Sequence, residues 1–151
     1  MIETVLRDGG CGGICRDLLA DLADWFGKPE SNAGYATAAE TQPTWLATLD
    51  GVPAGLMILK RHEAALEIWF MAARRDMRRR GVGRALMAQA ERAARAEGLW
   101  LTVKTLGPSA VYEPYAETRA FYRAMGFRPL EEFTDLWNDR ENPCLFMAKA
   151  L

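Results

Sequence analysis

The chain has 151 residues, of which 50% are apolar and 26% charged, and its net charge is −1. This length suits one compact domain with its own core, and no apolar run approaches the roughly 20 residues that span a bilayer. The composition therefore argues against a membrane protein. Because the N-terminus also lacks the plan of a secretory signal, we expect a cytoplasmic protein.

Positive charge is concentrated in one part of the chain. Residues 71–104 hold nine basic and three acidic side chains, whereas residues 1–70 hold five basic and ten acidic ones. A compact basic segment in an acidic molecule suits a small polyanion better than DNA or RNA, which usually need a broad basic surface. The charge pattern therefore predicts no nucleic-acid partner and directs attention to residues 71–104.

The cysteines indicate neither disulfides nor a metal site. Cys11, Cys15 and Cys144 are odd in number, and none belongs to a C-x-x-C pair or stands beside a histidine at metal-ligand spacing. Cys11 and Cys15 could share a helix face, for which ordinary packing is the favoured interpretation. We expect reduced thiols and no metal.

The first half of the chain predicts a strand, a helix and a β-hairpin. Residues 2–6 are typical of a short strand, and residues 15–26 carry apolar side chains at helical spacing. Residues 44–49 and 54–60 flank the turn sequence Asp-Gly-Val-Pro, which favours a hairpin.

The second half alternates strands and helices. Residues 66–73 form an apolar run with one acid, typical of a central strand, and an Ala-rich helix is expected over residues 83–97. Residues 99–106 predict another strand, followed by a loop to about residue 114 and a helix through Met125. Closing strands are expected at residues 127–130 and 144–149. Without an internal repeat or linker, the pattern predicts one α/β domain over residues 1–151.

The turn between the strand at 66–73 and the next helix has the composition of a phosphate site. Its sequence is Arg78-Arg79-Arg80-Gly81-Val82-Gly83, followed by Arg84. The first N–H groups of a helix have no backbone partner and the helix dipole favours an anion, while arginine forks match phosphate oxygens. The Walker pattern is absent, and Leu86 stands where the Rossmann pattern needs glycine or alanine.

This hexad resembles the acyl-CoA loop [QR]-x-x-G-x-[GA] of the GNAT family of N-acetyltransferases. A second segment, Phe121-Tyr122-Arg123-Ala124-Met125-Gly126-Phe127, is similar to the family's later F-Y-x-x-x-G-F signature. The resemblance covers roughly residues 44–130. It implies a single-domain GNAT fold, with a mixed, twisted sheet whose strands at 66–73 and 99–105 splay apart, flanked by helices.

The resemblance also implies where acetyl-CoA binds. Its pantetheine arm would lie in the gap between the splayed strands and pair with backbone around Met71, Ala72 and Ala73, where an N–H would polarise the thioester carbonyl. Such an oxyanion hole stabilises charge on the tetrahedral intermediate. The turn at residues 78–84 would hold the pyrophosphate.

Two residues are candidates for acid–base catalysis. Glu67 shares a strand face with Trp69, Met71 and Ala73 by the two-residue period, and its carboxylate could accept the amine proton. The alternative is a solvated or salt-bridged strand glutamate. Tyr122 matches a tyrosine that many GNAT members place near the coenzyme sulfur, where it could protonate the leaving thiolate. Otherwise it is a core aromatic. Many members also have Asn seven residues earlier, where this chain has Tyr115, so that contact does not carry over.

Other residues are candidates for binding the acceptor. Tyr112, Glu113 and Tyr115 combine aromatic rings with an acid, which suits a cationic amine, although a loop packed on its own core is equally consistent. The single histidine, His62, could act as a base, but the favoured interpretation is an exposed turn residue. By analogy with the family, residues 27–43 and 106–117 are expected to be variable substrate loops.

These observations predict an enzyme that moves an acetyl group from acetyl-CoA to a primary amine by direct attack. The acceptor would be a small molecule or a peptide, with a preference for a cation because the segments outside residues 71–104 are acidic. The alternative is a catalytically silent acyl-CoA sensor, and family habit suggests a homodimer.

Overall fold

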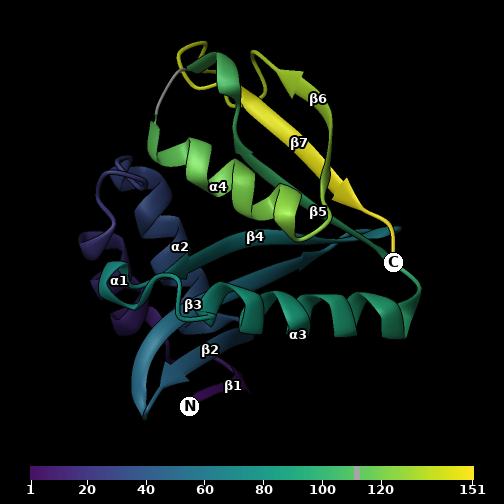
Figure 1. The fold of residues 1–151 in the computed structure, drawn as a ribbon. Helices are drawn as coiled ribbons and strands as arrows, with labels where there is room; N and C mark the ends of the chain where they lie inside the picture. The colour runs from purple at the N-terminus through teal and green to yellow at the C-terminus, as the bar shows by residue number, and fades with distance from the viewer. Residues whose placement is uncertain (111–112) are drawn as a thin grey trace. The chain divides into compact units, whose positions relative to one another are not determined.

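The computed structural model describes residues 1–110 and 113–151, in which helices are interspersed among the strands along the chain (Figure 1). The strands are β1 (Ile2–Arg7), β2 (Thr44–Leu49), β3 (Val52–Arg61), β4 (Ala65–Ala73), β5 (Trp100–Leu106), β6 (Arg128–Phe133) and β7 (Cys144–Lys149). The α-helices are α1 (Gly12–Asp21), α2 (Pro29–Thr41), α3 (Val82–Glu97) and α4 (Glu113–Ala124), and short 3-10 helices lie at η1 (Arg75–Met77) and η2 (Pro108–Ala110).

The strands of the described residues form one seven-stranded sheet in the order β1-β2-β3-β4-β5-β7-β6. β4 pairs with β5 in parallel, from Ala65 opposite Trp100 to Ile68 opposite Val103. The pairs β1–β2, β2–β3, β5–β7 and β6–β7 are antiparallel. The prediction of a mixed α/β sheet with flanking helices is confirmed.

The chain divides into two compact units. The first comprises residues 1–60 and 69–90, and the second comprises residues 61–68 and 91–151. β4 and α3 each contribute residues to both units. The gap predicted between the ends of the strands at 66–73 and 99–105 involves both units and stays a prediction.

In the first unit, α1 and α2 bury their apolar side chains together with those of the strands. The shared core comprises Cys11, Cys15, Leu18, Leu19, Leu22, Ala36, Ala38, Ala39, Leu46, Leu56, Ile58, Phe70 and Ala72. Gly55 in β3 permits a close approach, because a Cβ there would lie 2.8 Å from both the Ala72 carbonyl oxygen and the Val82 Cγ1. This glycine lets β3 pack tightly against the end of β4 and the start of α3.

In the second unit, β5 pairs with both β4 and β7, and β7 continues the sheet to β6. Its buried apolar side chains include Leu101, Val103, Tyr122, Phe127, Leu145 and Met147. Gly126, at φ 96°, ends the turn after α4 in the left-handed conformation that glycine adopts at low cost. The predicted glycine stop after this helix is thus observed.

The helix predicted over residues 15–26 begins and ends earlier, since α1 spans Gly12–Asp21. Its first turn is held from a distance, because the Gly12 N–H donates to Glu40 Oε2 at 3.0 Å. A cap supplied 28 residues away leaves no signal near the helix start. Residues 22–25 continue as turns, and the Phe26 N–H donates to the Leu22 carbonyl.

The prediction of a loop over residues 27–43 is wrong, because most of this segment forms α2, Pro29–Thr41. Pro29 occupies the start of the helix, where its missing N–H costs nothing. The buried residues of α2 are Ala36, Ala38 and Ala39. Since small side chains form no recognisable apolar stripe, hydrophobic periodicity cannot reveal this helix.

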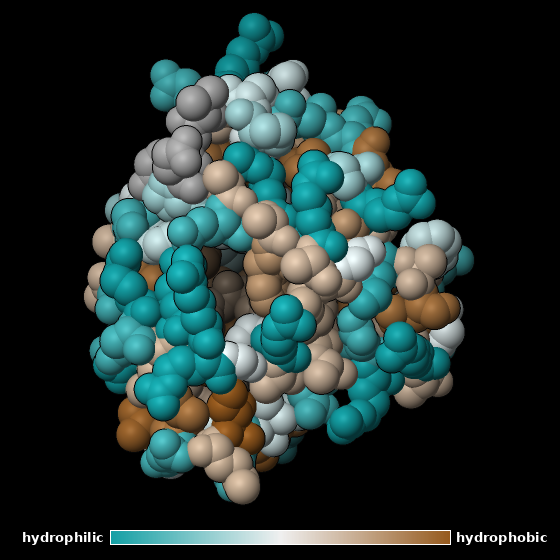
Figure 2. Space-filling view, in the orientation of Figure 1, coloured by the Kyte–Doolittle hydropathy of each residue, from teal (hydrophilic) through white to brown (hydrophobic). Residues whose placement is uncertain are grey.

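Hydrophilic side chains cover much of the face in Figure 2, with hydrophobic residues in small groups. Among the large hydrophobic residues that remain exposed are Leu6 in β1, Trp100 in β5, and Leu136 and Trp137 between β6 and β7. Among the described residues, no helix is both long and apolar enough to cross a membrane.

Candidate active-site residues

The turn between β4 and α3 presents the start of a helix in an unusual backbone conformation. Arg79 has φ 61° and Gly81 has φ 90°, both in the left-handed region. The Ala85 N–H donates to the Gly81 carbonyl at 3.0 Å, which closes the first turn of α3 around Val82 and Gly83. Turns with left-handed residues can direct backbone N–H groups toward an anion, and a helix start adds its own N–H groups.

The arginines of this turn take two different environments. Arg79, Arg80 and Arg84 are exposed, as a site for a polyanion requires. Arg78 is half-buried, and its Cζ lies 4.2 Å from the centre of the Trp25 ring. Arg75 lies over the same ring at 4.9 Å, so two guanidinium groups stack on one indole. The predicted role of Arg78 toward phosphate therefore competes with this contact.

The end of β4 follows the predicted two-residue alternation. Trp69, Met71 and Ala73 are half-buried, whereas Phe70 and Ala72 are buried. Trp69, Met71 and Ala73 are thus alike in exposure, as expected for one strand face. Glu67, predicted to share that face, is buried.

An aromatic cluster lies beside this face within the first unit. The ring of Tyr35, in α2, is 5.0 Å from Trp69 and 4.7 Å from Phe70, measured between centroids. Phe26 completes the cluster at 5.4 Å from Phe70. Sequence reasoning missed Tyr35 because it stands in the helix that was expected to be a loop.

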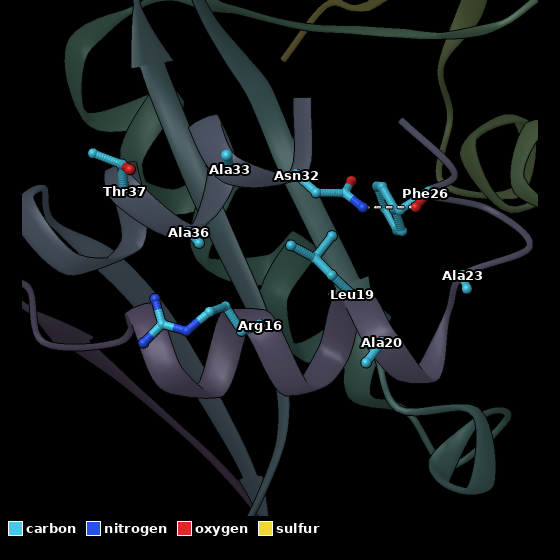
Figure 3. A pocket seen from close by; sticks show the side chains of 9 residues that line it. All are labelled: Arg16, Leu19, Ala20, Ala23, Phe26, Asn32, Ala33, Ala36 and Thr37. Atoms are coloured by element: carbon cyan, nitrogen blue, oxygen red, sulfur yellow. Dashed lines mark hydrogen bonds between the residues drawn. The ribbon is translucent and has the colours of Figure 1, made fainter. Parts of the chain in front are cut away.

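A groove of about 510 Å³ lies between α1 and α2 (Figure 3). It is lined by Arg16, Leu19, Ala20, Ala23, Phe26, Asn32, Ala33, Ala36 and Thr37. Asn32 Nδ2 donates to the Phe26 carbonyl at 2.8 Å, which ties the start of α2 to the segment after α1. None of the predicted site residues lines this groove.

In the second unit, Glu67 belongs to a cluster of ionisable side chains. Its side chain is 6% exposed, and Oε1 lies 2.8 Å from His62 Nε2. Lys104 in β5 places its Nζ 3.4 Å from both Glu67 carboxylate oxygens. Glu67 is therefore salt-bridged, as the alternative interpretation expected, but it also contacts a histidine that can exchange protons.

His62 is exposed, as predicted, yet it is more than a turn residue. Its side chain is 42% exposed, and the Nε2 atom is directed at Glu67. The backbone holds it in place, because the His62 N–H donates to the Ala65 carbonyl at 2.8 Å. The favoured interpretation from sequence, a histidine without a function, overlooked this contact because only the tight turn into β4 brings residue 62 against residue 67.

Tyr122 lies in α4 and is buried. Its ring packs edge-on against Phe121 and Phe127, with centroid distances of 5.4 and 5.5 Å. Burial, and to a lesser extent Tyr115, raises the pKa of its phenol above the ordinary value. A phenol is protonated at neutral pH even at its ordinary pKa, and the raised pKa leaves it a hydrogen-bond donor while making it a weaker acid.

The residues predicted to bind the acceptor are only partly described. Tyr115 is half-buried in α4, and Glu113 is the first residue of that helix. Tyr112 lies outside the described residues. The loop expected over residues 106–117 is in part the helical segments η2 and α4.

The cysteines carry no sign of reactivity. All three are free and buried. Burial raises the pKa of Cys15 and Cys144 to about 11 each, and it also raises that of Cys11. Because the thiolate is the nucleophile, these thiols are poor candidates for a covalent acyl intermediate at neutral pH. The described residues also contain no cluster of three or more metal-binding side chains.

The predicted site residues thus fall into two sets. Met71–Ala73 and the turn at 78–84 lie in the first unit, whereas Glu67, Tyr115 and Tyr122 lie in the second. Each set is described within its own unit. That the two sets act together on one substrate stays a prediction.

Comparison with known proteins places this geometry in context. The model of the acetyltransferase (GNAT) family matches residues 13–127. No curated protein matches the sequence.

Three solved structures are similar over nearly the whole chain. A protein of the GNAT family from Desulfovibrio desulfuricans is 18% identical with a TM-score of 0.83, covering 99% of both chains. A GNAT acetyltransferase from Elizabethkingia anophelis with acetyl-CoA bound is 18% identical, with a TM-score of 0.76 and coverage of 99% and 98%. The ribosomal-protein-S18-alanine N-acetyltransferase from Escherichia coli is 16% identical, with a TM-score of 0.77 and coverage of 100% and 96%. At such identities the likeness shows the fold.

Proposed function

The chain belongs to the acetyltransferase (GNAT) family, and from this premise we propose that it transfers an acetyl group from acetyl-CoA to a primary amine. The observation that carries the proposal is the turn between β4 and α3. Arg79 and Gly81 adopt left-handed conformations there, immediately before a helix start with exposed arginines. Such a turn fits the pyrophosphate of coenzyme A.

Acetyl-CoA is the proposed donor, with support from the relative that carries it. The Elizabethkingia anophelis structure has acetyl-CoA bound and shares this fold. In this chain, residues 78–84 would hold the pyrophosphate, and backbone around Met71, Ala72 and Ala73 would hold the pantetheine arm and the thioester carbonyl. The donor supplies an activated acetyl group, so the protein needs to position this group and to accept the proton that the amine loses.

We propose direct attack of the amine, because the buried thiols are unsuited to carry the acetyl group. The amine nitrogen forms a bond to the carbonyl carbon, and the carbon–sulfur bond breaks. Glu67 accepts the proton that the nitrogen loses. Tyr122, whose phenol is protonated at neutral pH, donates a hydrogen bond to the departing sulfur.

A cationic acceptor is the preferred class. Residues 1–70 hold ten acidic and five basic side chains, which favours approach of a positively charged amine. Glu113 and the rings of Tyr112 and Tyr115 are the proposed contacts for it. An ammonium that binds to such groups must lose a proton before attack, which again requires a base.

The test is release of free CoA thiol from acetyl-CoA with a panel of amines that includes polyamines, aminoglycosides, amino acids and peptide N-termini. We expect turnover with at least one cationic amine. Binding of acetyl-CoA without turnover on any amine would instead favour a silent acyl-CoA-binding module. Propionyl-CoA and succinyl-CoA in the same assay establish the acyl preference.

A further inference from the structure

A buried base must return its proton to solvent after every turnover, and Glu67 has little direct access to water. Its side chain is 6% exposed, whereas the neighbouring His62 side chain is 42% exposed. The two side chains meet at a hydrogen-bond distance of 2.8 Å between Oε1 and Nε2. His62 thus spans the distance from a buried carboxylate to the protein surface.

We propose that His62 relays the amine proton from Glu67 to solvent. The inference rests on the proposed function, in which Glu67 accepts that proton. In the Nδ1–H tautomer of His62, the proton moves from Glu67 Oε1 to the lone pair of Nε2, and the Nδ1 proton leaves to water or buffer. The Glu67 carboxylate is then regenerated. Exchange with solvent, in which Nε2 loses a proton and Nδ1 gains one, returns the histidine to its starting tautomer.

The other groups that face Glu67 are unsuited to this role. Lys104 lies 3.4 Å from both carboxylate oxygens, but an ammonium has three donors and no lone pair to accept a proton. Cys144 interacts electrostatically with Glu67 and Lys104, and burial raises its pKa to about 11. Imidazole, in contrast, ordinarily gains and loses a proton near neutral pH.

The backbone around His62 builds this contact into the fold. The His62 N–H donates to the Ala65 carbonyl at 2.8 Å, and the Trp100 N–H donates to the Ala64 carbonyl at 3.1 Å. These bonds fix the turn between β3 and β4 against the start of β5. The imidazole is therefore held beside Glu67 by a structured turn.

The test compares His62→Ala, His62→Gln and the matched surface control Glu63→Gln. We expect kcat of both His62 variants to fall by about 10- to 100-fold, with the KM for acetyl-CoA unchanged. This loss lies at or below the lower end of the effect usual for a group that transfers a proton. Added imidazole should restore His62→Ala and leave the wild type unaffected. Glu63→Gln, which changes the exposed neighbour in the same turn, should keep full activity.

The glutamine variant separates a relay from a structural role. Glutamine can hydrogen-bond to Glu67 but cannot carry a proton at neutral pH. Full activity of His62→Gln, or of His62→Ala without imidazole, would overturn the relay while leaving acetyl transfer by the wild type intact. A wild type that acetylates no amine would overturn the relay together with the proposed function.

A measurement without substrate tests the contact itself. In ¹⁵N NMR spectra of the free protein, Glu67→Gln should shift the Nε2 resonance of His62 more than its Nδ1 resonance. Because His62 is the only histidine, its ring signals need no assignment to a residue, and only Nε2 and Nδ1 have to be told apart. An unchanged Nε2 resonance would contradict the contact and with it the relay.

Discussion

The turn at residues 78–84 in the first unit and the cluster of ionisable side chains around Glu67 in the second differ in one respect. The backbone carries the proposed function of the turn, whereas side chains carry that of the cluster. In the turn at residues 78–84, the backbone carries the feature, through the left-handed Arg79 and Gly81 before α3. In the cluster, individual side chains carry it, with Glu67 between His62 and Lys104. Changes to the turn should therefore affect donor binding, whereas changes to the cluster should affect turnover.

The largest effect is expected from Glu67→Gln. Without the carboxylate, the amine proton has no buried acceptor, so kcat should fall by about 100-fold or more while acetyl-CoA affinity stays within about twofold. Steady-state kinetics and calorimetry measure the two quantities. Loss of donor affinity equal to the loss of turnover would break the proposed separation between turn and cluster.

Gly83→Val should have the next largest effect, on binding. Gly83 is half-buried in the first turn of α3, and a β-branched side chain there would obstruct the approach of the pyrophosphate. We expect acetyl-CoA affinity to fall by about tenfold or more, a loss of about 1.4 kcal/mol. Ala88→Val places the same side chain at an exposed position of α3 and is the control. Unchanged affinity of the Gly83 variant by calorimetry would remove this turn from the donor site.

Tyr122→Phe tests whether the phenol in the second unit contributes to turnover. The phenol would no longer donate to the leaving sulfur, so kcat should fall by about tenfold with little change in the KM for acetyl-CoA. The ring remains to pack against Phe121 and Phe127, which should preserve the fold. A normal turnover number would leave Tyr122 as a core residue only.

The smallest effect is expected on the free energy of unfolding at high pH. It tests whether the cysteine thiols are buried and protonated in the folded chain. Folding raises the pKa of Cys15 and Cys144 from 9.0 to about 11, so the folded chain holds these protons more strongly than the unfolded one. Their contribution to stability is complete below pH 9 and is lost as pH rises through 11. Urea unfolding at pH 8, 9.5 and 10.5 should show a decline that Cys144→Ala reduces. An undiminished decline in that variant would exclude Cys144 as its source.

Much of the fold could be predicted because hydrophobic periodicity marks it. The hairpin of β2 and β3 and the helix α3 follow from alternation, turn residues and a glycine stop, all of which are local. The helix α2 was not predicted because alanines form its buried face. The start of α1 was not predicted because Glu40 caps it from a distant position in the sequence. Signals carried by small residues or by long-range bonds cannot be read from a window of sequence.

For the candidate site, individual residues could be named from the sequence, but their contacts could not. The family motifs identified the turn at 78–84 and Tyr122 as candidates, and the two-residue period of the strand at 66–73 identified Glu67. The neighbours of Glu67 could not be found this way, since the parallel register that sets Glu67 opposite Thr102 is what brings Lys104 near. Likewise, no spacing rule places Arg78 over Trp25, because the segment after α1 and the turn at 78–84 meet only in the folded unit.

The stacking of Arg75 and Arg78 on Trp25 gives the first unit an optical property. A guanidinium over an indole changes the polarity around the ring, and therefore the wavelength and intensity at which the ring emits. If Arg78 moves to meet a pyrophosphate, Trp25 loses one of its two guanidinium contacts, and the emission of this indole, one of five in the chain, changes. The chain thus carries an intrinsic fluorophore in contact with its proposed donor-binding turn.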